Sequence, residues 1–172
     1  FLAGAPFTGA YGASAPGKVY AFVRAPGACT TLDFETEDDF ATPLVNGQHL
    51  DSEFGRLVAL GSAGSNAGLA LFDSSPCGPN DPSQDRDLLV GTGNVLVLQT
   101  ENYPPDGNDV FPRPNDDDDG GTLAFAFAAP VTPLSLRLID VDAGDGATQV
   151  VLRDGTARRR TFTVPSDWTG DL

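Results

Sequence analysis

The sequence predicts an all-β protein, a jelly-roll-like antiparallel β-sandwich with an extended N-terminal segment. Helical signals are almost absent, because the 172 residues include 20 glycines and 14 prolines and no long window carries apolar residues at helical spacing. Short β-type runs recur instead, and turn-forming residues separate them. Because several runs alternate between apolar and polar residues, each needs a second sheet to cover its apolar face.

Nine runs are predicted to be strands, and they recur along most of the chain. In order they are 17–24, 29–35, 55–61, 68–73, 94–100, 122–129, 134–141, 148–154 and 159–164. Two of the runs alternate most clearly, with Leu123, Phe125 and Phe127 on one face of the first and Leu134, Leu136 and Leu138 on one face of the second. Strands of this length and pattern are typical of a sandwich.

Two long segments interrupt the strands, at residues 74–93 and 101–121, and both are rich in Pro, Asn, Asp and Gly. Loops of that length are usually either functional or disordered. Cys29 and Cys77 are the only cysteines, and a disulfide between them would hold the first loop in place. Two buried free thiols are the alternative.

The composition bounds the setting and the partners. A net charge of −14 and a pI near 4.1 argue against nucleic acid, because phosphate binding needs clustered cations. The one basic run, Arg158–Arg160, is interpreted as ordinary surface or a subunit contact. No apolar run is long enough to span a membrane. The chain starts at Phe1 and has no methionine, so we expect a processed, secreted or cell-surface protein, or a fragment of a longer one.

The run Asp116–Asp119 needs a neutralising partner, because adjacent like charges repel one another. Calcium takes about six to eight oxygen ligands, and carboxylates from separate loops can supply them. The predicted ligands lie where strands end, at Glu35, Asp73, Asp85, Asp87, Glu101, Asp118, Asp119 and Asp140. One ion among three or four of these would order both long loops; a solvated acidic loop is the alternative. The stretch "DVDAGDG" at 140–146 lacks the last glutamate of an EF-hand and is predicted to be a hairpin turn.

The first 28 residues are small, apolar and proline-spaced. A "GAP" turn followed by a strand of the type "GxVYxF" resembles the closing portion of an FG-GAP repeat of integrin-type β-propellers, although the calcium loop of that repeat is missing upstream. The segment is interpreted either as a flexible linker or as an unpartnered strand that docks on the sheet of a neighbouring subunit. The predicted division is therefore 1–28 as a donor segment and 29–172 as the calcium-stabilised sandwich.

The order of motifs "DFE", "LFDSS", "DRDLL", "GNVLVLQTE", "DDDDGGTLAFAF" and "LRLIDVD" resembles a secreted bacterial β-sandwich domain. That domain occurs in extracellular proteins of planctomycetes, cyanobacteria and other bacteria with sorting-signal anchors. The resemblance covers about residues 32 to 154 and implies a calcium-stabilised domain of surface or matrix proteins without established catalytic activity. This chain departs from the pattern at "NDDDDGG" and "QTE", which leaves the ligand assignments at Asp116–Asp119 and Glu101 open.

Catalysis is not predicted. His49 is the only histidine and lies in a polar, turn-like stretch, and neither a nucleophile elbow nor a phosphate-binding loop is present. We expect a non-enzymatic subunit of a fibre or surface layer, joined to copies of itself by N-terminal strand docking and stabilised by calcium. The alternative is an adhesion module that binds extracellular polysaccharide. Its candidate glycan contacts are Tyr103, Phe111 and Trp168, although Trp168 also suits a cap on the core.

Overall fold

A computed structural model of the chain describes residues 10–13, 20–25, 28–55, 58–81, 86–141, 148–153 and 159–165. Ten strands lie within these ranges. They are β1 (Ala10–Ala13), β2 (Tyr20–Ala25), β3 (Ala28–Leu32), β4 (Val58–Ala63), β5 (Asn66–Asp73), β6 (Asn94–Thr100), β7 (Thr122–Phe127), β8 (Thr132–Arg137), β9 (Gln149–Arg153) and β10 (Arg159–Thr163). Across the same ranges we find no helix with the length and apolar character that a bilayer crossing requires.

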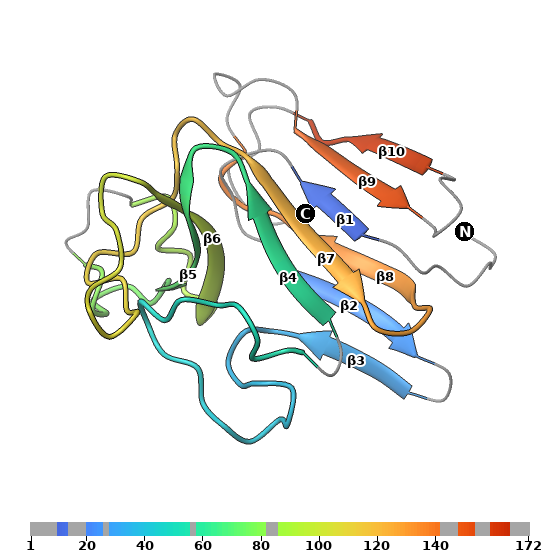
Figure 1. The fold of residues 1–172 in the computed structure, drawn as a ribbon, viewed down its shortest axis with the longest axis horizontal. Coiled ribbons are helices and arrows are strands. Elements are labelled where there is room, and N and C mark those ends of the chain that lie inside the picture. Colours follow the sequence, from blue (N-terminus) through green and yellow to red (C-terminus); the bar gives the residue numbers. More distant parts are fainter. Residues whose placement is uncertain are drawn as a thin grey trace.

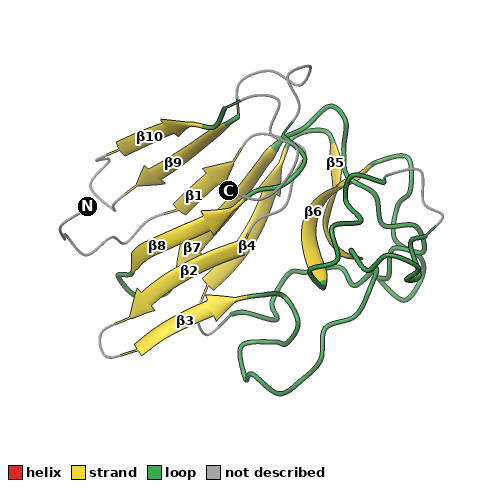
Figure 2. Ribbon diagram, turned by 180° about the vertical axis from the view of Figure 1, so that it is seen from behind, coloured by secondary structure: helices red, strands yellow, loops and turns green. Residues whose placement is uncertain are grey.

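The strands form three antiparallel sheets (Figure 1). Five strands have the order β10-β9-β1-β7-β4, three have the order β3-β2-β8, and β5 pairs with β6. The three-stranded sheet lies along one face of the five-stranded sheet, and the β5–β6 pair lies beside both (Figures 1 and 2). The all-β prediction is confirmed, and each predicted run overlaps one of the strands β2–β10.

The N-terminal segment contributes strands to both larger sheets. β1 lies between β7 and β9, and β2 lies between β3 and β8. The division predicted at residues 28 and 29 falls inside the β2–β3 pair, where Arg24 is opposite Cys29. In this structure the described part of the N-terminal segment therefore pairs with strands of its own chain.

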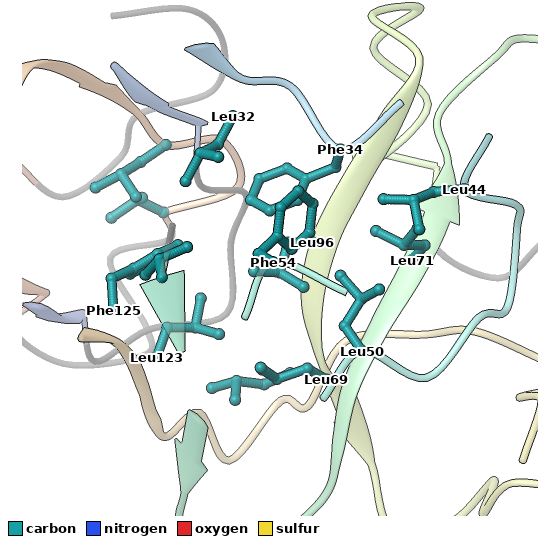
Figure 3. Close-up of a cluster of buried hydrophobic side chains, with 14 of the residues drawn as sticks. Leu32, Phe34, Leu44, Leu50, Phe54, Leu69, Leu71, Leu96, Leu123 and Phe125 are labelled. Carbon is teal, nitrogen blue, oxygen red and sulfur yellow. The ribbon is translucent and has the colours of Figure 1, made fainter. Parts of the chain in front are cut away.

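The main core fills the space between the sheets and the β5–β6 pair (Figure 3). Leu32 of β3, Phe125 of β7 and Leu96 of β6 all belong to it, so it joins the three sheets. The connection between β3 and β4 also supplies core residues, and the rings of Phe34 and Phe54 meet edge to face with centroids 5.8 Å apart. This long connection is therefore part of the core, which its irregular, acidic sequence did not predict.

The run "NVLVLQT" of β6 is buried along its whole length, because both faces of the β5–β6 pair are covered. Leu96 and Leu98 point to the main core. Val95 and Val97 lie in a second cluster. The two long loops contribute Leu88 and Phe111 to that second cluster, so they form a layer over the outer face of the β5–β6 pair. A strand with two covered faces needs continuous rather than alternating apolar residues.

The structure differs from two of the predictions made around residues 134–146. Leu134 is 56% exposed, whereas Leu136 packs against the core and Leu138 is buried. Phe22 of β2 pairs with Ser135 and Val23 pairs with Pro133, so Leu134 is the extra residue of a β-bulge and leaves the inward face. The predicted hairpin at 140–146 is wrong, because β8 and β9 belong to different sheets.

Candidate functional site at the acidic end of β6

The acidic loop after β6 is fixed by Gln99, whose side chain is completely buried. Its Nε2 donates hydrogen bonds to the carbonyls of Tyr103 and Arg113, both at 3.1 Å, and its Oε1 accepts one from the Asn115 N–H at 2.9 Å. The Thr100 N–H also donates to the Asn115 carbonyl at 3.1 Å. Loop 101–121 is thereby closed against the end of β6, and the aspartates that follow Asn115 are held at that end.

Asp117 differs from the other aspartates of the run by a buried side-chain oxygen without a partner in the described part of the chain, although Asp116 is buried as well. Asp117 is only 4% exposed, and its Oδ2 is buried without a hydrogen-bond partner among the described residues. Its Oδ1 accepts a long hydrogen bond of 3.3 Å from the Asp119 N–H, and its carbonyl accepts one of 2.7 Å from Gly120 N–H, which closes a turn. A buried carboxylate oxygen without a partner is costly, so it marks a place where a ligand would stabilise the fold.

The electrostatics at Asp117 point the same way. Burial raises the pKa of the Asp117 carboxyl, and the negative charges of Asp119, Glu101 and Asp118 raise it further, against the lowering effect of the Asp119 N–H. Asp118, Asp119 and Glu101 are exposed to solvent. The Asp117 carboxyl is thus buried, and the three carboxylates whose charges act on it are exposed, a donor set that suits a hard divalent cation such as calcium.

The predicted ligands are divided between the two ends of the β5–β6 pair. Glu101, Asp118 and Asp119 lie at the end where Thr100 is opposite Asn66, whereas Glu35 and Asp73 lie at the other end, where Asp73 is opposite Asn94. The Glu35 Oε1 accepts a hydrogen bond from the Asn94 N–H at 2.7 Å. The Asp73 Oδ1 accepts one from the Ser75 N–H at 2.9 Å. Both of these carboxylates are therefore engaged by backbone groups of their own chain.

The remaining predicted ligands are Asp85, Asp87 and Asp140. Asp87 is exposed, Asp140 is half-buried just after β8, and Asp85 lies outside the described residues. In the described ranges no three His, Cys, Asp or Glu side chains stand close enough to hold a metal ion as they are placed. An ion at Asp117 would therefore have to draw the exposed carboxylates of Glu101, Asp118 and Asp119 inward.

The predicted disulfide between Cys29 and Cys77 is not formed. Cys77 is a free, exposed thiol in the loop that follows β5. That loop is held instead by polar side chains: the Ser74 hydroxyl donates to the Gly93 carbonyl at 2.7 Å, and Asn80 Nδ2 donates to the Asp73 carbonyl at 3.0 Å. Side-chain hydrogen bonds thus hold this loop in place, which is the role that the sequence predicted for the disulfide.

The structure describes two of the three candidate glycan contacts, Tyr103 and Phe111. Phe111 is only 1% exposed and belongs to the second hydrophobic cluster, so its proposed contact with a glycan is wrong. The Phe111 N–H donates a hydrogen bond to the Gly47 carbonyl at 2.7 Å, which holds this part of the loop against the connection between β3 and β4. Tyr103 is half-buried, and the guanidinium of Arg113 lies 4.3 Å from its ring centroid. Trp168 lies outside the described residues.

His49 is half-buried rather than fully exposed. Its Nδ1 is 2.8 Å from Asp109 Oδ1, and its ring meets the edge of Phe111 with centroids 5.3 Å apart. Gly68 has no side chain where the His49 imidazole lies, and a Cβ there would approach Nε2 to 2.7 Å. This histidine therefore packs loop 101–121 onto β5.

Sequence reasoning missed the polar residues that fix the site. Asn94 is the first residue of the run "NVLVLQT" and Gln99 is the last but one, and both are buried. Asn94 Nδ2 donates to the carbonyls of Phe34 and Leu44 at 3.0 and 3.2 Å. An amide within a continuous apolar run is the signal that was available, because a buried amide must find partners outside its own strand.

No protein family, curated protein or solved structure matches this chain.

Proposed function

We propose that this protein is a non-enzymatic, extracellular structural domain, a β-sandwich that a calcium ion stabilises at loop 115–121 and that joins to copies of itself in a fibre or surface layer. The observation that carries the proposal is the buried Asp117 Oδ2, which lacks a hydrogen-bond partner among the described residues and lies among the charges of three other carboxylates. A buried carboxylate oxygen among negative charges destabilises the fold when no cation is bound, and it stabilises the fold when it binds a cation.

The sandwich architecture is supported by the shared core. Leu32 from the three-stranded sheet and Leu123 and Phe125 from the five-stranded sheet are all buried in one cluster. Two facing sheets that bury their inner side chains together are the defining arrangement of a β-sandwich. The β5–β6 pair closes one end of this core, and its outer face is covered by the two long loops.

Calcium is supported by the chemistry of the donors. Carboxylate oxygens from a flexible loop are the ligands that calcium prefers, and its coordination tolerates irregular geometry. The ion would hold Asp117 in its ionised form and offset the repulsion among Asp118, Asp119 and Glu101. A cation at this place would also fix the turn that leads from the acidic run into β7.

A structural role is supported by the polar side chains that hold the loops in place. Asn94, Gln99 and Glu35 all direct their side chains to backbone groups of distant segments. Side chains engaged in this way hold loops in place and are not available for a substrate. The same design gives a rigid unit, which suits a repeated building block.

The calcium step is tested by urea unfolding in excess calcium and in EGTA. Because the ion binds only the folded form, calcium at roughly one hundred times its Kd should raise the free energy of unfolding by about 2.7 kcal/mol. Asp117→Asn should abolish this increase. Asp51→Asn, an exposed aspartate whose Oδ1 accepts from the Ser52 hydroxyl at 2.8 Å, removes the same charge elsewhere and should retain it. Equal unfolding midpoints of the unsubstituted protein in calcium and EGTA would refute the proposal.

A further inference from the structure

The continuity of the five-stranded sheet depends on β1. The sheet order is β10-β9-β1-β7-β4, so among the described strands β1 alone connects the β9–β10 pair to β7 (Figure 1). β1 has four Cα partners on β7, from Ala10 opposite Ala126 to Ala13 opposite Leu123. It has two on β9, where Gly12 is opposite Val151 and Ala13 is opposite Val150. Without β1, both β7 and β9 would present an unpaired edge inside the sheet.

We propose that the slot between β7 and β9 is the acceptor site for self-assembly, and that its occupant in the assembled state is residues 10–13 of a second copy of this chain. This inference deepens the proposed structural role and rests on it. The same four residues fill the slot in the single chain, so the complementary sequence, direction and register already exist in every copy. No other partner needs to be supplied.

Exchange of β1 between copies costs little energy. Backbone hydrogen bonds between β1 and its neighbours are the same whether the strand comes from its own chain or another, so the exchange costs little enthalpy. β1 is the first described strand, and its exchange does not require any other strand to change partners. Only six residues, 14–19, separate it from β2, which belongs to the other sheet. A connection this short in sequence favours swapping over a longer one.

The geometry of the exchange sets the kind of assembly. A copy that gives β1 to one neighbour and receives β1 from another makes a head-to-tail contact, which continues into a linear polymer unless it closes. Two copies that exchange β1 reciprocally form a closed dimer. Both products require the same slot, and both place residue 10 of one chain opposite residue 126 of another.

The register supplies a direct test, using paired cysteines in a background that carries Cys29→Ser and Cys77→Ser. Ala10→Cys and Ala126→Cys are made in separate chains, and Ala126 lies on the exposed side of β7. The two chains are mixed in denaturant, refolded at high protein concentration and oxidised. A disulfide between them in excess of random collision requires β1 of one chain to occupy the slot of the other. We expect this product to exceed the random-collision control by roughly tenfold or more, because pairing raises the effective concentration.

The collision control pairs Ala10→Cys with Ser135→Cys, an exposed position on β8, which pairs with β2 and not with β1. A second control carries Ala10→Cys and Ala126→Cys in one chain and is oxidised at low concentration, which locks β1 into its own slot. The locked chain should remain monomeric in sedimentation velocity at concentrations where the reduced chain associates. Equal crosslinking of positions 126 and 135, or association of the locked chain, would overturn the inference.

Failure here is distinguishable from failure of the proposed calcium role. The calcium-dependent unfolding of the locked monomer reports the Asp117 site without any assembly. A locked monomer that calcium stabilises, together with no crosslink specific to position 126, would reject the exchange and retain the calcium site. A specific crosslink with no calcium effect would retain the exchange and reject the ion.

Discussion

Gln99 Nε2 donates a hydrogen bond to the carbonyl of Arg113 at 3.1 Å, across a separation of fourteen residues. The same side chain bonds the Tyr103 carbonyl and the Asn115 N–H, so one buried amide fixes three points of loop 101–121. The aspartate run begins directly after Asn115. The position of the acidic site is therefore set by a neutral side chain of β6.

Replacing Gln99 with alanine should destabilise the protein by about 2–4 kcal/mol, because three hydrogen bonds are lost and two carbonyls and one N–H lose their partner. It should also weaken calcium binding, since the acidic loop would no longer be held in place. Urea unfolding and calorimetric titration measure the two effects. Gln149→Ala, at an exposed position of β9, should change neither. A stable Gln99→Ala variant with unchanged calcium affinity would contradict the role assigned to this amide.

The stability in EGTA should fall as the pH rises through the raised pKa of Asp117. The folded state raises the pKa of this carboxyl above its ordinary value by burial and by the charges of Asp119, Glu101 and Asp118. The stabilising contribution of the Asp117 carboxyl is thus fully present below its pKa in the unfolded chain, near 3.8, and is lost above its raised pKa in the folded protein. Asp117→Asn should remove this part of the pH dependence, measured as the difference between the two unfolding curves from about pH 4 to pH 7. Parallel curves for the two proteins would contradict it.

Calcium should reverse the difference in pH-dependent stability between the unsubstituted protein and Asp117→Asn. A bound cation favours the ionised carboxylate, so the unsubstituted protein should gain stability relative to Asp117→Asn as the pH rises in excess calcium. The reversal is measured in the same urea titrations. Potassium at equal ionic strength serves as the control for general screening, which should reduce repulsion without restoring the full effect.

Gly47→Ala should cost about 2 kcal/mol or more. Gly47 has φ +78°, and a Cβ there would overlap the Phe111 carbonyl oxygen. Its N–H donates to the Leu71 carbonyl at 2.8 Å, so the residue joins loop 33–57 to β5 and to the second long loop. Gly61→Ala, where a Cβ would meet nothing within 4 Å, should change stability by less than about 0.5 kcal/mol. Similar urea midpoints for the two variants would contradict this.

Phe111→Ala should destabilise the protein by about 3–5 kcal/mol, because a large buried side chain is removed from the cluster over β5–β6. Phe40→Ala, at a position that is 59% exposed, should have little effect on the free energy of unfolding. The comparison separates a packing role of Phe111 from the glycan contact that its loop position suggested. A Phe111→Ala variant of unchanged stability would speak for a surface role.

The local pattern of the sequence predicted the strands well. Leu123, Phe125 and Phe127 alternate as one inward face, and all three contact the main core. Alternation is a property of neighbouring residues, so it can be recognised without knowing the partners of a strand. The bulge at Leu134 could not be recognised, because it arises from the register between β8 and β2. The run 10–13 was not among the nine predicted strands and lay only within the donor segment 1–28, whereas in the structure it pairs with β7 and β9.

The candidate site was predicted in composition but not in arrangement. The sequence by itself determined that the protein is all-β and that acidic side chains gather where strands end. Only the tertiary structure decided that Asp117 is buried, that Glu35 and Asp73 lie at the opposite end of β5–β6, and that Phe111 belongs to a core. Burial depends on which distant segments cover a residue, and hydrogen bonds such as those of Gln99 join residues that the local pattern leaves unrelated.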